Sequence, residues 1–339
     1  MIIGFSRKPY GKGGAISWIK TFSNYCISNG HQVKFSYKNR MDVFCSVANF
    51  SLPKELRYLK NRNIKILQRL GSIFLDYNYD DKQIVIDGNN HLKQLIPYAD
   101  TIVYQSVFSK KELYGSLYNK MEPDGDIIYN STNASIFSPD SRTIYRHSNK
   151  KIILCSAYWG SLNTSLECIK LIVETAKKLQ NHPEIEFWIL GLAPIETEEY
   201  IRKYNLPNIT KLNLHNPIRY TLMPYYLKSA DLVLHLKAHE GCSNAVIETM
   251  SVGTPLVGLN SGSLPELLGD AALLADCTGD IKKFPKVDIN DLVKKILITL
   301  ERSNIYRSKM LKRAKSFSEE EQCSRYLSIL EKLYKSKYE

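Results

Sequence analysis

Short apolar runs alternate with stretches of helical periodicity along almost the whole chain. Such runs, when rich in Val, Ile and Leu, are typical of strands buried on both faces of a parallel sheet. The stretches between them repeat apolar residues at three- and four-residue spacing, as amphipathic helices do. This alternation predicts an α/β fold with parallel sheets between helices. The predicted strands are residues 2–5, 32–35, 43–47, 64–67, 84–86, 101–105, 127–129, 152–155, 186–190, 209–212, 232–236, 255–259 and 272–275.

A polar stretch at residues 138–150 interrupts the alternation and is the best linker in the sequence. A chain of 339 residues is long enough for two domains. We therefore predict one doubly wound domain over residues 1–143 and a second over residues 144–318. Residues 319–339 are predicted to end the chain as a separate helix, with Tyr326, Leu330 and Leu333 on one face.

The most informative motif follows the apolar run at residues 230–236. Residues 239–255 read His-Glu-Gly-Cys-Ser-Asn-Ala-Val-Ile-Glu-Thr-Met-Ser-Val-Gly-Thr-Pro. Its second and third residues form a turn off the carboxyl end of the predicted strand, where open α/β sheets bind ligands. The pattern then predicts a helix that Ser243 or Asn244 caps and that Gly253, followed by Pro255, ends. The residues expected to pack inward from this helix are Ala245, Val246, Thr249 and Met250.

Two carboxylates and a helix start give this motif its chemistry. Glu240, in the loop above the strand, can accept hydrogen bonds from sugar hydroxyls, and Glu248, more than one turn into the helix, can accept two from a ribose diol. The free backbone N–H groups at the helix start form an anion site. By itself, the bare spacing of the two glutamates favours a loop charge and a solvated helix face.

The motif resembles the Glu-x7-Glu signature of glycosyltransferase family 4, the retaining nucleotide-sugar transferases with the GT-B fold. That resemblance implies two doubly wound, Rossmann-like domains facing a central cleft, with the nucleotide sugar held by the second domain. It also implies that the final helix crosses back to the first domain. Thr249 replaces the usual Ala of the family pattern. The flanking positions that match are Gly241, Asn244, Met250, Gly253 and Pro255.

Two glycine loops extend the resemblance. Residues 258–268 look like the family's strand, glycine loop and Pro-Glu helix start, which places backbone amides near the donor sugar. Residues 11–14 lie between a strand and a helix, where the family brings backbone close to the donor phosphates. His239 reaches the sugar or braces its loop. The resemblance thus assigns catalysis to Glu240, His239 and Lys12, and donor binding to Gly13, Gly14, Gly241, Cys242, Ser243, Asn244, Glu248, Gly262 and Ser263.

The second predicted domain departs from the family at its first loop. The family carries an Arg and a Lys there that clamp the diphosphate, whereas residues 156–164 of this chain read Ser-Ala-Tyr-Trp-Gly-Ser-Leu-Asn-Thr. Three possibilities stay open: another cation replaces the Arg and Lys at the diphosphate, polar hydrogen-bond donors hold the diphosphate instead, or sugar transfer is weak or absent. A His that the family often has near the acceptor is also missing from residues 69–73. The substitute groups are Lys8, Lys12 or Lys237 as cations, and Ser161, Asn163 and Thr164 as donors.

Composition and charge narrow the partners. The formal charge of +12 splits unevenly: residues 1–143 carry 19 Lys or Arg against 12 acids and are more basic than the remainder, which carries 27 against 22. No nucleic-acid-binding motif accompanies this charge, so nucleic acid is not an expected partner. One cluster is read either as a surface for anionic lipid or an anionic acceptor, or as a solvated helix. The cluster comprises Lys54, Arg57, Lys60, Arg62, Lys65 and Arg69.

Cofactors and targeting segments are not expected. The seven cysteines are scattered without a Cys-x-x-Cys pair, so zinc and disulfides are not predicted. Asp124-Gly125-Asp126 precedes a strand instead of following one, and we interpret it as a turn and not as a metal site. No segment has the roughly 20 apolar residues of a membrane span, and no secretory signal is recognised. We expect a cytoplasmic protein that makes at most peripheral membrane contact.

Together these features predict a retaining glycosyltransferase of hexosyltransferase type. It would move a sugar from a UDP or GDP donor to a glycan or lipid-linked acceptor, without a metal or other cofactor. The resemblance implies that the departing diphosphate itself takes the acceptor proton. Two alternatives stay open: a nucleotide-sugar epimerase of GT-B fold, and a glycan or nucleotide-sugar binding protein that has lost catalysis.

Overall fold

The computed structural model describes residues 1–11, 13–144, 146 and 149–337, and these divide between two units. The first unit contains Met1–Phe74, Asp81–Asn130 and Glu319–Glu339, and the second contains Leu75–Asp80 and Ser131–Ser318. The division at Asn130 precedes the predicted boundary at residue 143.

The reason lies in the contacts that the chain makes just after Asn130. The Thr132 amide donates to the Phe317 carbonyl at 3.4 Å, and the ring of Phe137 lies 5.1 Å from that of Tyr220. Residues 131–143 are therefore held by the second unit, although the predicted linker begins only at residue 138.

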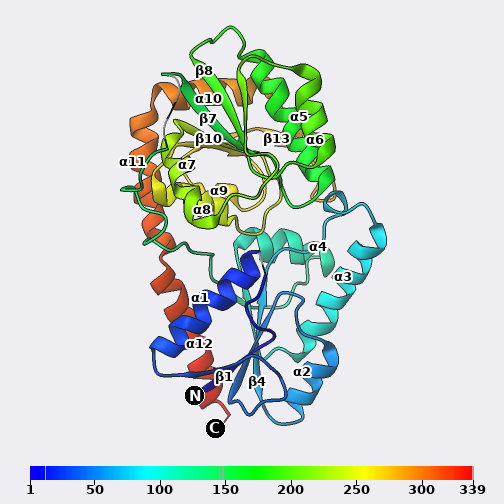
Figure 1. The fold of residues 1–339 in the computed structure, drawn as a ribbon. Coiled ribbons are helices and arrows are strands. Elements are labelled where there is room, and N and C mark those ends of the chain that lie inside the picture. Colours follow the sequence, from blue (N-terminus) through cyan, green and yellow to red (C-terminus); the bar gives the residue numbers. More distant parts are fainter. Residues whose placement is uncertain (12, 145, 147–148, 338–339) are drawn as a thin grey trace. The chain divides into compact units, whose positions relative to one another are not determined.

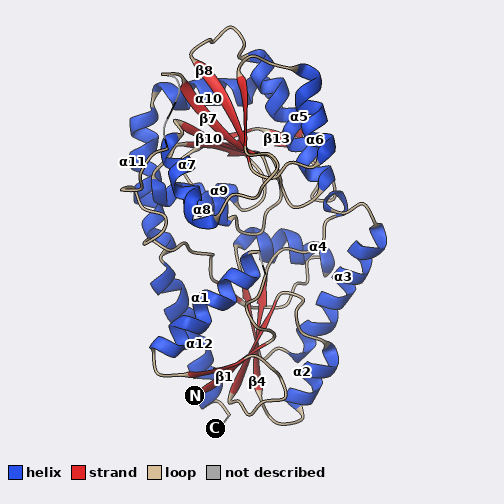
Figure 2. Ribbon diagram, in the orientation of Figure 1, coloured by secondary structure: helices blue, strands red, loops and turns tan. Residues whose placement is uncertain are grey.

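The first unit is built on a parallel sheet, in which β1 and β4 are labelled in Figures 1 and 2. Its strand order is β2-β1-β3-β4-β5-β6. The central strand β3 is buried along its whole length, which explains its continuous apolar run. The strands are β1 Ile2–Phe5, β2 Gln32–Lys34, β3 Val43–Val47, β4 Lys65–Leu70, β5 Thr101–Tyr104 and β6 Asp126–Ile127.

Helices cover both faces of this sheet. Helices α1 and α12 lie on one face and α2 and α3 on the other (Figure 1). The final helix packs through Tyr326, whose ring lies 4.7 Å from that of Trp18, and through the fully buried Leu330. Burial of Leu330 stabilises the unit by roughly 1.5–3 kcal/mol. The helices are α1 Gly14–Ser28, α2 Pro53–Lys60, α3 Lys82–Leu95, α4 Gly115–Leu117 and α12 Glu319–Lys335.

The strand predicted at residues 84–86 is wrong, because these residues lie inside α3. Ile84 and Ile86 are about half exposed, whereas Val85 between them is buried. Three consecutive apolar residues on a helix point in different directions, so only one of them reaches the core. The Asp81 carboxylate caps the helix by accepting from the Gln83 amide at 2.8 Å.

The second unit repeats the architecture with strand order β12-β11-β10-β7-β8-β9. All neighbouring strands in this sheet are parallel, so the predicted α/β class with two doubly wound parallel sheets is confirmed. A short antiparallel pair, β13 and β14, lies outside the sheet. The strands are β7 Lys151–Ser156, β8 Ile185–Leu190, β9 Ile209–Leu212, β10 Leu232–His235, β11 Leu256–Leu259, β12 Leu273–Ala275, β13 Cys277–Thr278 and β14 Lys286–Val287.

Helices also flank the second sheet on both sides, with α5 and α6 on one side and α7 and α8 on the other (Figure 1). Helix α5 buries Ile169, Ile172 and Val173 against the strands, and α10 packs beside it. The helices are α5 Leu162–Lys178, α6 Ile195–Tyr204, α7 Met223–Ser229, α8 Asn244–Val252, α9 Leu264–Leu268, α10 Ile289–Glu301 and α11 Ser303–Ala314.

Candidate active site

The sheet of the second unit reverses its winding direction between β7 and β10. From β7 the chain continues outward through β8 and β9, whereas β10, β11 and β12 lie on the other side of β7. Open α/β sheets bind ligands outside the carboxyl ends of the strands at such a switch point. Here those ends lead into the loops 157–161 and 236–243, and the second loop begins the predicted motif.

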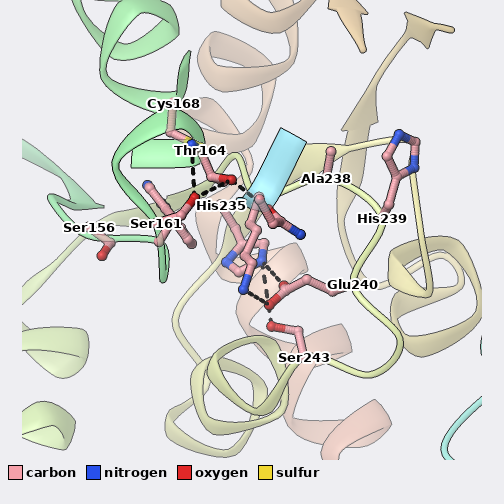
Figure 3. Close-up of polar contacts among 12 residues, drawn as sticks. Ser156, Ser161, Thr164, Cys168, His235, Ala238, His239, Glu240 and Ser243 are labelled. Atoms are coloured by element: carbon pink, nitrogen blue, oxygen red, sulfur yellow. Dashed lines mark hydrogen bonds and ion pairs between the residues drawn. The ribbon is translucent and has the colours of Figure 1, made fainter. Parts of the chain in front are cut away.

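The Glu240 carboxylate turns back toward the end of β10 (Figure 3). Its Oε2 atom lies 2.7 Å from Nε2 of His235, and its Oε1 atom lies 3.4 Å from Nζ of Lys237. The Ser243 hydroxyl donates a further hydrogen bond to the carboxylate. The side chain is 17% exposed, which leaves part of the carboxylate open to a ligand.

These partners keep Glu240 ionised. Burial alone raises the pKa of this carboxyl, but the Lys237 ammonium, the His235 imidazole and the Ser243 hydrogen bond outweigh burial and hold the pKa at about 2. An ionised carboxylate only accepts hydrogen bonds, and it accepts them strongly. The group is therefore suited to hydroxyl groups of a sugar.

The second carboxylate, Glu248, lies in the middle of α8. This helix follows Ser243 and ends at Gly253, which takes the left-handed conformation with φ 78°. Ala245, which we expected to pack inward, is exposed instead. It lies on the outer side of the first turn, and Ile247 takes the inward position. The buried residues of α8 are Val246, Ile247, Thr249, Met250 and Val252.

Glu248 has an environment opposite to that of Glu240. Burial raises the pKa of its carboxyl to about 7, although a hydrogen bond with Tyr220 acts in the other direction. Two carboxyls eight positions apart in the sequence thus titrate in separate pH ranges. Such separated pKa values are a mark of functional sites.

The loop after β11 packs directly on the Glu240 loop. The Ser263 amide donates to the Glu240 carbonyl at 3.0 Å. Gly262 takes φ 65°, and a Cβ atom there would lie 2.7 Å from the Glu240 nitrogen and 3.0 Å from its carbonyl oxygen. The sequence placed Gly262 and Ser263 in the site, and the structure brings both against Glu240.

We expect Gly262→Ala to disturb the site more than an ordinary glycine substitution does. The strained φ and the overlap with the Glu240 backbone together cost about 2–4 kcal/mol, and relief of the overlap displaces Glu240. Gly30→Ala is the matched control, because Gly30 has φ 79° but open space around its Cβ position and lies outside the site. Chemical unfolding and transfer assays of both variants test this. Equal losses in the two variants would contradict it.

His239 is fixed by contacts inside its own loop. Its Nδ1 atom lies 2.9 Å from the Ser261 hydroxyl, and its Nε2 atom lies 3.3 Å from the Lys283 carbonyl oxygen. The residue takes the left-handed conformation with φ 52°, and its ring points away from the Glu240 carboxylate (Figure 3). Burial lowers the pKa of its imidazole, which favours the neutral form. Of the two roles that the sequence left open, these contacts favour bracing of the loop.

Residues Leu75–Asp80, which we call the strap, belong to the second unit although they come from the first half of the chain. The Tyr77 hydroxyl donates to the Ala238 carbonyl at 3.0 Å. The Tyr77 ring lies 5.9 Å from that of His239 and 6.0 Å from that of Phe284. The strap therefore supports the Glu240 loop from its side.

The strap also covers the start of α5. The Thr164 hydroxyl donates to Oδ1 of Asn78 at 2.5 Å, and the Asn163 amide donates to Oδ1 of Asp80 at 2.5 Å. Ser161 caps the helix by accepting from the Thr164 amide at 3.2 Å. Ser161, Asn163 and Thr164, which the sequence suggested as substitutes for the missing diphosphate clamp, therefore form hydrogen bonds inside the second unit. Sequence reasoning missed the strap, whose signal was the polar and aromatic run at residues 76–81.

A family model described as "Glycosyl transferases group 1" matches residues 140–317, which is more than half of the chain. The chain belongs to the group 1 glycosyl transferases. It is therefore a glycosyltransferase. The matched region covers β7 to α11 and includes Glu240, Glu248 and Gly262.

Solved structures share the fold of this group 1 glycosyl transferase. Sucrose-phosphate synthase from Thermosynechococcus elongatus superposes with a TM-score of 0.75 at 14% identity, over 99% of each chain. HepE of Anabaena in complex with UDP and glucose gives 0.67 at 13% identity, over 98% of this chain and 99% of that one. A glycosyltransferase from Rickettsia africae gives 0.71 at 14% identity, over 98% of each. The GT-B fold is thereby confirmed.

A curated relative shares a shorter segment. O-antigen chain mannosyltransferase B of Escherichia coli is 41% identical over 54 residues, which is 16% of this chain and 14% of that protein. The match therefore spans about a seventh of the relative's length.

The donor-binding residues predicted for this glycosyl transferase fall into two sets. Gly241, Cys242, Ser243 and Asn244 continue directly from Glu240 into the start of α8, so the second unit brings them together. A separate set belongs to the first unit: Gly13, with φ 113°, and Gly14 precede and begin α1. Lys12 lies outside the described residues.

The basic cluster at residues 54–69 does not form one surface of this enzyme. Arg69 is 1% exposed, lies 4.5 Å from the Trp18 ring centroid and donates to Asn130 at 2.7 Å. Lys60 and Lys65 both contact the Asp100 carboxylate. Arg69 is buried because it lies near the end of β4. The sequence, in which the cluster reads as one run of basic residues, did not show this. The exposed members without these contacts are Lys54, Arg57 and Arg62.

The remaining sequence predictions concern metals and membranes. Asp124 forms an ion pair with Lys110 at 2.6 Å, which lowers the pKa of the Asp124 carboxyl. Among the described residues, no cluster of three or more His, Cys, Asp or Glu side chains is arranged to hold a metal ion. Within the same residues, every helix is too short or too polar to cross a bilayer.

Proposed function

We propose that this glycosyltransferase is a retaining enzyme of the family 4 type, which moves a sugar from a UDP or GDP donor to a glycan or lipid-linked acceptor. The observation that carries the proposal is the Glu240 carboxylate at the switch point, ionised and partly open between His235 and Lys237. A neutral or fully buried group there could not grip sugar hydroxyls with the same strength.

Each predicted donor-binding residue has a part in this proposal. Glu248 would hold the ribose diol once its carboxyl is ionised, and Glu240 would hold the sugar. The amides that follow Gly262 would contact the same sugar. The backbone N–H groups at the start of α8 would face the diphosphate, because helix starts favour anions. Gly13 and Gly14 would let backbone of the first unit approach the phosphates.

The cation for the leaving group is proposed to be Lys237. The family-type Arg and Lys are absent from residues 156–164, and Asn163 and Thr164 are engaged by the strap. Lys237 is 28% exposed and lies beside Glu240. Its ammonium would balance the charge that develops on the departing diphosphate, which is the main demand on catalysis here.

The chemical step we propose needs no base from the enzyme. The bond between the anomeric carbon and the diphosphate oxygen breaks, and the acceptor oxygen forms its bond on the same face of the sugar. The acceptor proton passes to an oxygen of the departing diphosphate. What the protein must supply is alignment and charge stabilisation, and His239 would only hold the Glu240 loop in place.

The ligands and activities of similar proteins support the substrate classes. HepE was solved with UDP and with UDP-glucose, and TarM of S. aureus with UDP and α-GlcNAc-glycerol. The sequence relative is a mannosyltransferase of an O-antigen chain. For a lipid-linked acceptor, the exposed bases Lys54, Arg57 and Arg62 would provide peripheral contact with anionic headgroups.

Incubation with UDP-glucose, UDP-galactose and GDP-mannose tests this proposal. We expect one donor to release its nucleoside diphosphate at a rate that rises when an oligosaccharide or lipid-linked glycan is added. Analysis of the product by NMR should show the anomeric configuration of the donor retained.

The alternative functions give different results in the same assay. Appearance of a free epimer without an acceptor would identify an epimerase. Binding without nucleotide release would identify a binding protein, for which the missing diphosphate clamp is the favouring observation. Absence of binding to every sugar nucleotide would refute the proposed site.

A further inference from the structure

His235 is an unusual residue for its position. It is the last residue of β10 and is 3% exposed, and its neighbours along the strand are apolar. The strand is hydrogen-bonded on both sides, to β7 and to β11. An imidazole buried at such a place costs free energy unless it is hydrogen-bonded. An apolar residue would fill the space without that cost, so the imidazole serves some other purpose.

The contacts of His235 define that purpose. Its ring lies 5.0 Å from the Trp159 ring, nearly perpendicular at 84°. Nε2 lies 2.7 Å from Oε2 of Glu240 and 3.5 Å from the Ser243 hydroxyl. The sheet and the Trp159 ring thus fix the imidazole, and the imidazole fixes one oxygen of Glu240.

The two oxygens of Glu240 consequently have different tasks. Oε2 is held by the strand through His235. Oε1 lies 3.4 Å from Lys237, too far for a strong hydrogen bond. Oε1 is the oxygen that His235 leaves for a ligand hydroxyl, and the bond at Oε2, together with the hydrogen bond from Ser243 to the carboxylate, sets its direction.

We propose that His235 is the positioning residue for the donor sugar, acting through Glu240. This inference rests on the proposed function, in which Glu240 holds that sugar. His235 does not touch the substrate. It orients the carboxylate before the donor arrives, so that little freedom is lost on binding.

Variants of His235 separate this role from simple packing. His235→Leu fills the space but removes the hydrogen-bond donor to Glu240. His235→Gln can place a side-chain amide N–H near the position of Nε2. His235→Asn is polar but too short to reach Oε2. We expect Leu and Asn to weaken binding of the nucleotide sugar by about tenfold or more, and Gln to keep it within about threefold.

The decisive measurement compares two ligands by calorimetry. For the donor that wild type binds, chosen from UDP-glucose and GDP-mannose, affinities are measured for the nucleotide sugar and for UDP or GDP alone. The sugar-free nucleotide does not reach Glu240, so we expect its affinity to change less than twofold in every variant. A loss of affinity confined to the nucleotide sugar supports the positioning role. An equal loss of affinity for both ligands, or no loss in the Leu and Asn variants, overturns the inference.

A matched control is available on the surface of the same unit. His182 also pairs with a glutamate, since its Nδ1 atom lies 3.1 Å from Glu184, but both side chains are exposed. His182→Leu should leave both affinities unchanged. If His235→Leu does not fold, the comparison of His235→Gln with His235→Asn decides the question. Failure of the proposed function is distinguished because wild type itself would then bind none of the nucleotide sugars.

Discussion

Replacement of Glu240 by Gln is expected to lower kcat/KM for the nucleotide sugar by about 10²–10³-fold. The amide keeps the shape of the side chain but loses the negative charge. It also turns an N–H group toward His235 or Lys237, which leaves a partner of the carboxylate unsatisfied. Steady-state kinetics with a saturating acceptor, together with a melting curve to confirm folding, measure the effect.

Glu184→Gln is the control for the Glu240 variant. Glu184 is exposed and pairs with His182 on the surface, so its loss should leave kcat/KM within about twofold of wild type. A Glu240→Gln enzyme with nearly normal kcat/KM would contradict the assignment of Glu240 to the donor sugar.

Replacement of Glu248 by Gln is expected to stabilise the protein at alkaline pH and to impair nucleotide binding. Burial raises the pKa of the Glu248 carboxyl to about 7 in the folded protein, against about 4.3 in an unfolded chain. Between these values the folded state binds the extra proton, so stability falls as pH rises from about 4.3 to 7. Above pH 7 the buried charge costs about 1–3 kcal/mol, which Gln avoids.

Chemical unfolding at pH 5 and at pH 8 measures the stability effect. The advantage of Glu248→Gln over wild type should be larger at pH 8. Glu174→Gln, which alters an exposed ion pair on α5, should show no such difference between the two pH values. A Glu248→Gln protein without a pH-dependent gain would mean that the carboxyl is not desolvated.

Nucleotide affinity should show the opposite dependence on pH. The ribose diol needs an ionised carboxylate as acceptor, so we expect affinity for UDP or GDP to fall by roughly tenfold for each pH unit below 7. The Gln variant should bind weakly, with little dependence on pH. Unchanged affinity in that variant would show that ribose lies elsewhere.

Much of the fold was predictable because the central strands of both sheets, such as β3 and β11, are buried along their whole length and have mostly apolar sequences. The predicted limits of β1, β3 and β9 agree with the structure. The error at residues 84–86 arose because a three-residue apolar run does not distinguish a strand from a buried helical turn. Asp81, a helix cap three residues earlier, was the signal that would have decided it.

The candidate site was predictable only where it is local in sequence. Glu240 and Glu248 lie in one loop and the helix that follows it, so the sequence spacing was enough to predict that both belong to one site. The partnership of His235 with Glu240 was hidden, because His235 reads as part of an apolar strand. The opposite pKa shifts of the two carboxyls depend on Lys237 and His235 beside Glu240 and on the burial of Glu248. That burial is a result of tertiary packing, which no local pattern describes.

The strap has a consequence for attempts to recombine this enzyme with its relatives. The chain passes between its two units at residues 74–75 and 80–81, as well as at 130–131 and 318–319. A chimera that joins a foreign amino-terminal half to residues 131–318 would inherit the glutamates but lose Tyr77, Asn78 and Asp80. Exchange of the second unit therefore requires that residues 75–80 be transferred together with residues 131–318. The amino-terminal part of the gene thus encodes a segment of the second unit, and the carboxyl-terminal part encodes a segment of the first.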